Sequence, residues 1–354
     1  MEERKPMKKT ALRLAFLALP LVSGINTLVP GLFRRIINKK LSSVQGFSGQ
    51  LQHLNISFLK GEFEVTNLQM QKSAASGGER AFLFLRKATL RINRMALWRG
   101  ALVGEIHLDM PSYVHMPLQE PEEKHFPTSL FSAPPFPVFV EKMEIINGSL
   151  DYLDRRKIPA VELTTNNINA QIHNIANFHY PDKQLPVHAQ IKGEAYGGEW
   201  TFNAKINLLE STPAFDMDME LKEVNMTGLN PIFKAYGKFD VNSGVLNVFS
   251  EVAAKQGKFK GYVKPLISDL DVLGPEDRDK KLIARLWEGL IGASAFVFTN
   301  PIKDQLGTKL PLEGELKDPK VHVAYAIGEV LINAFVAALR PSIDYEININ
   351  SVKK

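Results

Sequence analysis

The chain of 354 residues contains no cysteine. This absence excludes disulfide bonds, thiol nucleophiles and cysteine-ligated metal sites. Eight histidines are present, but no two of them are spaced as His-x-His or His-x-x-x-His, and the sequence contains no Gly-x-Ser-x-Gly, Gly-x-Gly-x-x-Gly or phosphate-loop motif. The sequence therefore predicts no catalytic residues, no metal site and no cofactor, and we do not expect an enzyme.

Neither sign of charge dominates the composition. Lysine and arginine number 43 against 38 aspartates and glutamates, which gives a net charge of +5. The basic residues gather near the N-terminus and do not alternate with aromatic residues along a stripe. A mild positive charge placed in this way favours an anionic membrane surface over nucleic acid as a partner.

Residues Leu14 to Phe33 form a stretch without charged residues. At about 1.5 Å per residue, a helix of this length spans roughly 30 Å, the thickness of a bilayer core. An uncleaved membrane anchor, a cleaved signal peptide and a buried or interfacial helix remain open; no Ala-x-Ala-like cleavage site follows, which favours the anchor. A basic cluster then follows, which would lie among lipid headgroups: Arg34, Arg35, Lys39 and Lys40. We therefore expect an anchor and juxtamembrane segment over residues 1–40 and a folded body over 41–354.

The body is dominated by short runs in which apolar and polar residues alternate. A period of two is typical of β-strands with one apolar and one solvated face. Gly, Pro and Asn separate the runs, which indicates antiparallel neighbours. The sequence predicts a mainly β protein built on a long, twisted antiparallel sheet. The residues expected to form one continuous apolar surface on neighbouring strands are Trp200, Phe202, Ile206, Phe215, Met217, Met219, Phe239 and Phe259.

Two helices and three irregular segments are expected within this pattern. Pro275 and the acidic residues after it predict a helix near 276–298, and Asp269–Gly274 would be the loop before it. A second helix near 326–340 is apolar almost all round but, at about 23 Å, too short to span a bilayer, so it should pack against the sheet. Residues 117–137 are rich in proline and predict a long surface loop. Asn147-Gly148 indicates either a tight turn or a β-bulge.

Several short segments, in their order along the chain, resemble the AsmA-like family of bacterial envelope proteins, and in particular its branch catalogued as a domain of unknown function. They follow the N-terminal apolar segment and are Gly-Glu-Phe-Glu-Val-Thr-Asn-Leu (61–68), Ala-Leu-Trp-Arg-Gly (96–100), Val-Glu-Lys-Met-Glu-Ile-Ile-Asn-Gly-Ser-Leu (140–150) and Gly-Lys-Phe-Lys-Gly-Tyr-Val-Lys-Pro-Leu (257–266). The resemblance implies a single span in the bacterial inner membrane, a periplasmic body with an open, taco-like groove, and a link to lipid transport and to bridge-like lipid-transfer proteins. It brings no catalytic residues. Larger members of the family are far longer, so a bridge from membrane to membrane is not expected here.

These observations lead to one main expectation and two alternatives. The protein is expected to bind or transfer membrane lipid in an apolar β-groove, with other envelope proteins as a further class of partner. The first alternative is a structural or assembly factor of the envelope whose groove is plugged by its own helices. The second is a hydrolase of envelope polymers, for which no site motif is present. Asp216, Asp218 and Glu220 could form a carboxylate cluster, but their alternate spacing on a strand is better explained by a solvated face.

Overall fold

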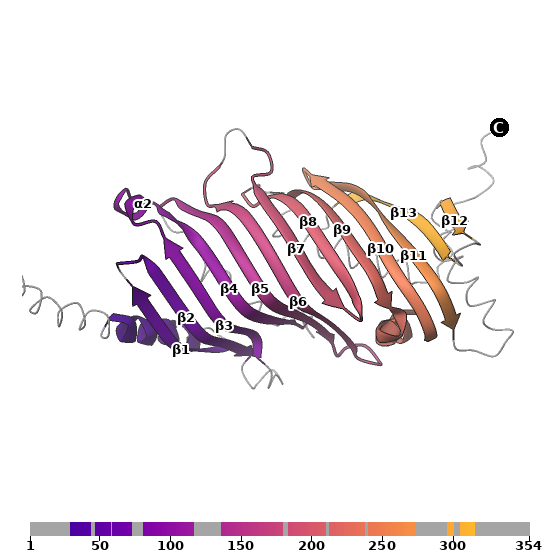
Figure 1. The fold of residues 1–354 in the computed structure, drawn as a ribbon, viewed down its shortest axis with the longest axis horizontal. Coiled ribbons are helices and arrows are strands. Elements are labelled where there is room, and N and C mark those ends of the chain that lie inside the picture. Colours follow the sequence, from indigo (N-terminus) through magenta and orange to yellow (C-terminus); the bar gives the residue numbers. More distant parts are fainter. Residues whose placement is uncertain are drawn as a thin grey trace, which may run out of the picture.

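The computed structural model describes residues 29–43, 47–57, 59–72, 81–116, 136–179, 183–209, 212–237, 240–272, 296–300 and 305–315. These residues form one 13-stranded sheet whose strands follow the chain order except that β13 lies between β11 and β12. Strands β1 and β12 lie at opposite ends of the molecule, so the sheet is open (Figure 1). The prediction of a mainly β protein with one long open sheet is confirmed. The strands are β1 (Phe47–Ser57), β2 (Glu62–Lys72), β3 (Ala81–Ile92), β4 (Leu102–His115), β5 (Val138–Asp154), β6 (Val161–Ala176), β7 (Val187–Ala195), β8 (Gly198–Asn207), β9 (Ala214–Asn225), β10 (Val241–Lys255), β11 (Lys258–Val272), β12 (Phe296–Asn300) and β13 (Gln305–Glu315).

One pair of neighbours departs from the predicted antiparallel arrangement. Strands β4 and β5 are parallel, with Leu102 opposite Val138 and His115 opposite Tyr152. Parallel neighbours need a connection that returns along the whole length of the first strand. The proline-rich segment predicted as a surface loop supplies the residues for this return, and 117–135 lie outside the described residues. The expectation of an entirely antiparallel sheet was therefore wrong at this pair.

Two adjacent rows of apolar residues cross the sheet on one face, each connecting directly opposed residues from strand to strand. The first row is Ile56, Phe63, Leu90, Ile106, Met143, Ile172, Ala189, Ala204, Met217, Val252, Gly261 and Leu312. The second is Leu54, Val65, Ala88, Leu108, Ile145, Ala170, Ile191, Phe202, Met219, Ser250 and Val263. Directly opposed side chains lie about 5 Å apart. The apolar face is therefore continuous from β1 to β11, and Ser250 is the one polar member of these rows.

The row between them is polar and faces the other way. It passes through Glu64, Thr89, His107, Glu144, Gln171, Gln190, Asn203, Asp218 and Glu251. Its centre is a hydrogen-bonded group in which Glu144 accepts from Lys142 Nζ at 3.1 Å and from His107 Nδ1 at 2.9 Å. The hydrogen bond from Lys142, followed by that from His107, lowers the pKa of the Glu144 carboxyl from its usual 4.5. Asp216, Asp218 and Glu220 lie on this solvated face of β9, separate from the apolar rows.

A line of interrupted pairing, here called the crease, crosses the first five strands. It consists of Gln52, Asn67, Arg86, Met110 and Asn147, one residue from each strand, and the ladders between these strands skip these residues. Asn67, Met110 and Asn147 have positive φ values of 54°, 50° and 53°. On either side of the crease the apolar residues are three positions apart instead of two: Leu51 and Leu54, Val65 and Leu68, Leu85 and Ala88, Leu108 and Pro111, Ile145 and Gly148.

The crease explains how the apolar face continues along each strand. In β1 both Leu51 and Ile56 are buried although an odd number of positions separates them, which regular alternation forbids. At the crease the alternation of the side chains shifts by one residue, so Leu51 and Ile56 lie on the same face of the sheet. Asn147-Gly148 is therefore an irregularity within β5, as the bulge alternative predicted, and not a hairpin turn.

Asn147→Val should destabilise the protein, because a β-branched residue at positive φ is strained and also loses the asparagine side chain. We expect the free energy of unfolding to fall by about 1–3 kcal/mol. Asn147→Gly is the matched control, since glycine adopts this conformation freely, and it should change stability by less than about 1 kcal/mol. Urea unfolding of the two variants checks the prediction, and equal losses would show that the positive φ of this residue is not required.

A helical cap, residues 226–237, closes one side of the sheet between β9 and β10. It consists of η3 (Met226–Leu229), α3 (Asn230–Ile232) and η4 (Phe233–Gly237). Asn230 fixes its base, because its side chain donates to the carbonyl of Val241 and accepts from the amide of Val241, both at 2.9 Å. The cap buries four side chains in one hydrophobic cluster with residues of β6, β9, β10 and β11: Met226, Leu229, Ile232 and Phe233.

A buried carboxylate stands near the cap, at the turn between β5 and β6. Asp154 is 1% exposed, and Arg156 donates from Nε and Nη2 to its two oxygens, both at 2.8 Å. These hydrogen bonds from the Arg156 guanidinium lower the pKa of the Asp154 carboxyl from its usual 3.8. Because the folded-state pKa is depressed, the stabilisation is present above the unfolded pKa and is lost as the pH falls through the folded one.

Arg156→Ala should therefore cost about 2 kcal/mol of unfolding free energy at neutral pH, because it leaves a buried carboxylate poorly paired. The difference from the parent should shrink towards zero as the pH falls through the depressed folded-state pKa of Asp154, below its usual 3.8, because the carboxyl then becomes protonated in both proteins. Arg155→Ala, a change of the neighbouring exposed arginine, should cost less than about 0.5 kcal/mol. Urea unfolding as a function of pH measures both differences. If the difference between Arg156→Ala and the parent persisted in acid, the stabilisation could not be assigned to the ionised carboxylate of Asp154.

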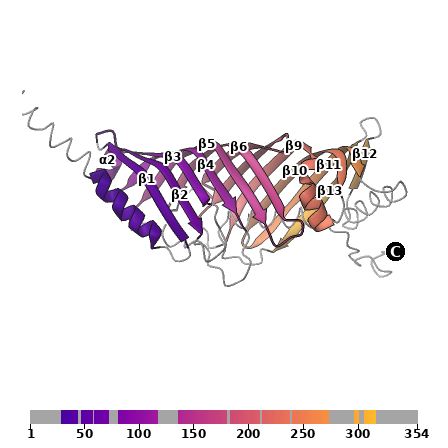
Figure 2. The same ribbon diagram turned by 90° about the horizontal axis from the view of Figure 1, so that it is seen from below.

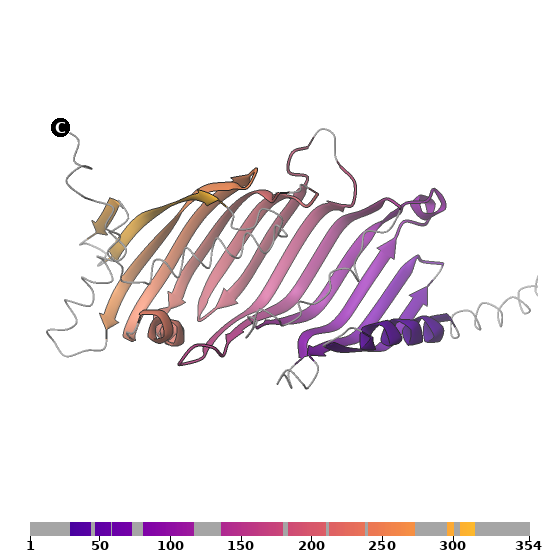
Figure 3. The same cartoon turned by 180° about the vertical axis from the view of Figure 1, so that it is seen from behind.

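The helix at residues 29–42 lies along the outer strand β1. Asn38 both donates to the carbonyl of Leu51, at 3.0 Å, and accepts from its amide, at 2.7 Å, so it pairs with the strand edge. Leu41 packs beside Phe47, Met70 and Phe82. Figure 3 shows this helix and the cap on the same face of the sheet. Edge strands expose unpaired backbone groups. The helix supplies hydrogen bonds to two of those groups on β1, the amide and the carbonyl of Leu51.

The predicted anchor overlaps this helix. Residues 14–28 lie outside the described residues, while residues 29–33 already belong to the helix and Pro30 is buried. In the part of the chain that the structure describes, no helix combines the length and the hydrophobicity needed to cross a bilayer.

Two predictions near the C-terminus need correction. Asp269–Val272 is the end of strand β11, not a loop, because these residues continue the pairing with β10. The helix predicted near 276–298 cannot extend to its predicted end, since residues 296–300 form β12 and pair with β13; Phe296, Val297 and Phe298 are residue types that favour strands. Residues 273–295 and the helix predicted near 326–340 lie outside the described residues.

Candidate functional site: an apolar trough

The two apolar rows differ in exposure along the sheet. On β2 to β6 nine of their ten members are partly exposed, and these ten residues are called the trough: Phe63, Val65, Ala88, Leu90, Ile106, Leu108, Met143, Ile145, Ala170 and Ile172. On β7 to β10 the same rows hold buried residues, including Ala189, Ala204 and Val252. Side chains of a closed core would be buried throughout. The sheet therefore presents an accessible apolar surface on β2–β6.

The sheet curves around this face. Figure 2 shows strands β1–β6 in front of β9–β11. The cluster under the cap joins Val161 of β6 to Val248 of β10, although three strands separate β6 from β10. Three intervening strands correspond to roughly 19 Å in a flat sheet. The cap therefore bridges the curved C-terminal half of the face and leaves the trough on β2–β6 beyond it.

The structure brings together most of the residues that the sequence predicted for the groove. Trp200, Phe202 and Ile206 of β8 lie opposite Leu221, Met219 and Phe215 of β9. Met217 lies in the same face opposite Ala204, and Phe259 of β11 lies opposite Ala254. Phe239 lies outside the described residues. Seven of the eight thus share one face.

These seven residues differ in what they can contact. Phe215 is 1% exposed and Met217 is 2% exposed, so both are core residues of the C-terminal half. Trp200, Phe202, Ile206, Met219 and Phe259 are partly exposed. The more open surface, on β2–β6, was not singled out from the sequence although it carries the same alternation. The signal that distinguishes the two halves is the cap, which covers only one of them.

Trp200 is held in a fixed position beside the trough. Its indole Nε1 donates to Thr165 Oγ1 at 2.7 Å. Its ring lies over Gly193, where an added Cβ would stand 2.7 Å from Cζ2 of the indole. A glycine is therefore required here for close approach, and the indole forms a flat, apolar surface with its polar atom already bonded.

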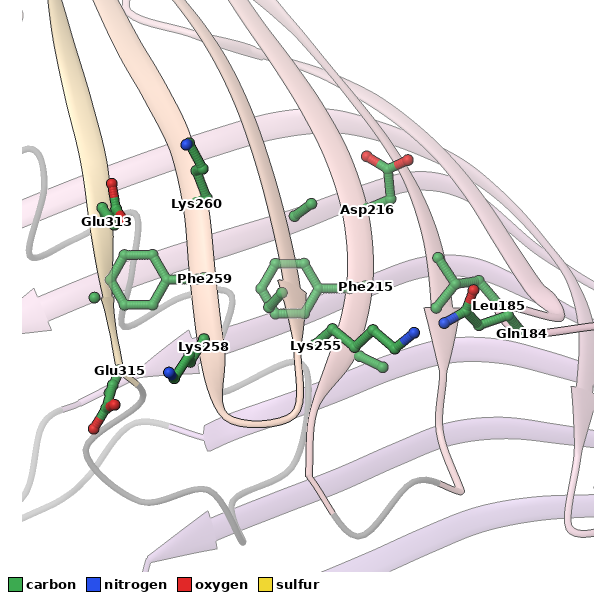
Figure 4. Close-up of a pocket in the computed structure, with 14 residues that line it drawn as sticks. Gln184, Leu185, Phe215, Asp216, Lys255, Lys258, Phe259, Lys260, Glu313 and Glu315 are labelled. Atoms are coloured by element: carbon green, nitrogen blue, oxygen red, sulfur yellow. The ribbon is translucent and has the colours of Figure 1, made fainter.

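A pocket of about 590 Å³ opens where β9, β10, β11 and β13 meet (Figure 4). The rings of Phe215 and Phe259 lie within it (Figure 4), and Leu185 and Ala254 add apolar surface. Its charged lining residues are Lys255, Lys258, Lys260, Asp216, Glu313 and Glu315. Three positive and three negative side chains line the pocket beside these apolar residues, so its formal charges balance.

The basic cluster lies at the β1 end of the sheet. Arg34, Arg35, Lys39 and Lys40 are exposed on the helix at 29–42, and Arg34 Nη1 donates to the Gln52 carbonyl at 2.7 Å. The same helix exposes three apolar side chains, Leu32, Phe33 and Ile36. Basic and apolar residues together on an exposed helix are typical of contact with a membrane interface.

The described residues contain no group of three His, Asp or Glu side chains that could hold a metal ion. No protein-family model matches the chain, and none of the curated proteins compared with it matches either. The AsmA-like resemblance therefore stays an expectation, and the trough is the feature from which a function can be argued.

Proposed function

We propose that this protein binds the acyl chains of membrane lipids in the trough and holds or transfers them within the bacterial envelope. The observation that supports this function is the pair of adjacent apolar rows that runs without a charge from β1 to β11 and is partly exposed on β2–β6. An apolar surface of this extent is rarely left open in a soluble protein unless it binds something. No catalytic group is needed for this function.

The dimensions and energies fit such a ligand. The five strands of the trough, at about 4.8 Å spacing, give a surface roughly 20–25 Å long, and a bilayer core of two opposed chains is about 30 Å thick. Each buried methylene contributes about 0.8 kcal/mol, so one acyl chain gains on the order of 10 kcal/mol. The trough is therefore long enough for one acyl chain laid across its strands, and that chain would be held well.

The same proposal places the protein at the inner membrane, with one N-terminal span and its β-rich body in the periplasm. The charge-free stretch at 14–33 and the basic cluster after it support an anchor at this end. The AsmA-like resemblance implies the same arrangement.

The cap favours a second candidate, a structural or assembly factor whose groove is filled by its own residues. Met226, Leu229, Ile232 and Phe233 occupy the apolar face at β6 and β9–β11. They do not reach the trough residues of β2–β5, which are partly exposed, and this is why lipid binding is preferred. The two candidates differ in whether lipid contacts the β5 strand.

Photo-crosslinking at two neighbouring isoleucines separates these candidates. Ile145 belongs to the trough, while Ile146 is 43% exposed and lies opposite Asp109 on the solvated face. A photoreactive residue placed at 145 in the full-length protein should capture lipid in cells, and the same residue at 146 should not. One step along a strand turns the side chain through the sheet while the backbone hardly moves.

Mass spectrometry of the crosslinked protein gives the readout. Lipid adducts at 145 with none at 146 are expected. Equal labelling at both positions, or none at 145 in a well-expressed protein, would leave the plugged scaffold as the better explanation.

A further inference from the structure

A short helix and a neighbouring turn form an exposed apolar surface at the β1 end of the sheet. Helix α2 (Arg94–Trp98) connects β3 to β4, and residues 59–61 connect β1 to β2 at the same edge. The amide of Ile92 donates to the carbonyl of Gly61 at 2.8 Å, which joins the two connections. Figure 1 shows α2 at the end of the molecule that also carries the helix at 29–42.

The apolar side chains of these connections point into solvent. Exposed fractions are 75% for Leu59, 66% for Met95, 52% for Leu97 and 90% for Trp98. These four residues are called the insertion patch. Helix α2 has no buried residue, so its apolar side chains add nothing to the core. Scattered single apolar residues are ordinary on a surface, but four together that include a tryptophan indicate an interaction site.

The backbone holds the insertion patch in a defined conformation. Asn93 accepts from the amides of Met95 and Ala96 at 3.1 and 3.2 Å. At the other end the amides of Gly100 and Ala101 donate to the carbonyls of Leu97 and Ala96, both at 3.0 Å. A five-residue helix is not stable by itself. These caps therefore fix a helix that buries none of its own residues and presents its apolar residues outward.

The charges within the two connections that carry the insertion patch have one sign, and the nearest acid along the chain, Glu62, faces Arg91. Lys60, Arg94 and Arg99 are exposed beside the insertion patch, and residues 59–61 and 93–101 contain no acidic residue. No ion pair is formed by these three cations among the described residues. Tryptophan prefers the boundary between headgroups and acyl chains, and lysine and arginine beside it attract anionic lipid. This chemistry fits a lipid surface better than a protein groove, which would need to supply acidic partners.

We propose that the insertion patch enters the interfacial region of an anionic lipid bilayer and seats the β1 end of the sheet on that membrane. The helix at 29–42 supports the same orientation, because it lies at this end of the long axis (Figure 1) and exposes the apolar side chains of Leu32, Phe33 and Ile36. The contact does not depend on whether the trough carries lipid. It gives the sheet a second attachment besides the expected N-terminal anchor and sets its direction relative to the membrane.

The absence of cysteine makes a single-site test direct. Trp98→Cys and Ile158→Cys are each introduced into the full-length protein and labelled with an environment-sensitive fluorophore. Ile158 is the matched control, since it is also 90% exposed and directly follows three basic residues, 155–157, but it is the one exposed large apolar residue of the turn at the opposite edge of the sheet. Both proteins are reconstituted into vesicles of phosphatidylethanolamine and phosphatidylglycerol, with and without nitroxide-labelled acyl chains.

The label at 98 should shift to the blue in vesicles and be quenched several-fold more by nitroxide lipid than the label at 158. Combining Trp98→Cys with Lys60→Glu, Arg94→Glu and Arg99→Glu should reduce this quenching at least twofold, because the attraction to anionic lipid is lost. Equal quenching at 98 and 158, or a label at 98 that stays as accessible to aqueous iodide in vesicles as in detergent, would overturn the proposal. If position 98 were protected in cells but not in vesicles, the insertion patch would be assigned to a protein partner. That result would also overturn the proposal.

Discussion

Proteins carrying Ile145→Asp should retain about 100-fold less lipid than the parent when purified from cells. The side chain of Ile145 lies in the trough and is only partly exposed, so a carboxylate there would have to be desolvated against an acyl chain. Such desolvation costs several kcal/mol, and each 1.4 kcal/mol lowers affinity about tenfold. Aspartate is too short to extend its charge out to water, as a lysine or arginine would.

Ile146→Asp is the control, because it introduces the same charge on the same strand but on the solvated face. Its lipid content should equal that of the parent, and both variants should melt cooperatively. Quantitative mass spectrometry of extracted lipid measures the difference. Similar lipid content in the parent and the Ile145→Asp protein would show that the trough on β2–β6 is not where lipid is held.

Phe233→Ala should be among the most destabilising single substitutions in the described part of the chain. Phe233 is 2% exposed and lies in the cluster that joins the cap to β6 and to β10. Removing a buried aromatic ring costs about 3–5 kcal/mol, since the transfer free energy is lost and a cavity remains. Because the cap bridges strands that are distant in the sheet, the curvature of the C-terminal half should loosen as well.

The neighbouring Lys234 supplies the control. It is 48% exposed and pairs at 2.7 Å with Asp240, which is 24% exposed; a partly solvated ion pair of this kind is worth about 1 kcal/mol, well below the loss expected for the aromatic ring. Urea unfolding of Phe233→Ala and Lys234→Ala therefore separates packing from surface charge. A loss for Phe233→Ala no greater than that for Lys234→Ala would mean that the cap does not hold the sheet together.

The one-sided sheet could be predicted because its signal is local. Alternation along β8 and β9 places Phe202 and Met219 on the same kind of face whatever the rest of the chain does. The antiparallel pairing of these strands follows from the short connections between them. The two rows that run across the sheet are consequences of this local pattern repeated from strand to strand.

Other features depend on contacts that the sequence does not display. The parallel pairing of β4 with β5 depends on where a long connection ends, which alternation cannot reveal. The cap was missed because Met226–Gly237 is too short to show a helical period, and its helices are stabilised by packing and by the bonds of Asn230. The open half of the apolar face was missed for the same reason, since only the position of the cap distinguishes it from the buried half.

The crease forms one margin of the trough. All eight trough residues of β2–β5 lie on one side of it, and the buried cluster of Phe47, Met70 and Phe82 lies on the other. Irregular residues of this kind bend the strand that carries them, and here they are aligned on five neighbouring strands. The boundary between the accessible part of the apolar face and the packed part beside the helix at 29–42 therefore follows a line drawn by the backbone, and a substitution that restored regular alternation at this line would turn the side chains beyond it to the opposite face.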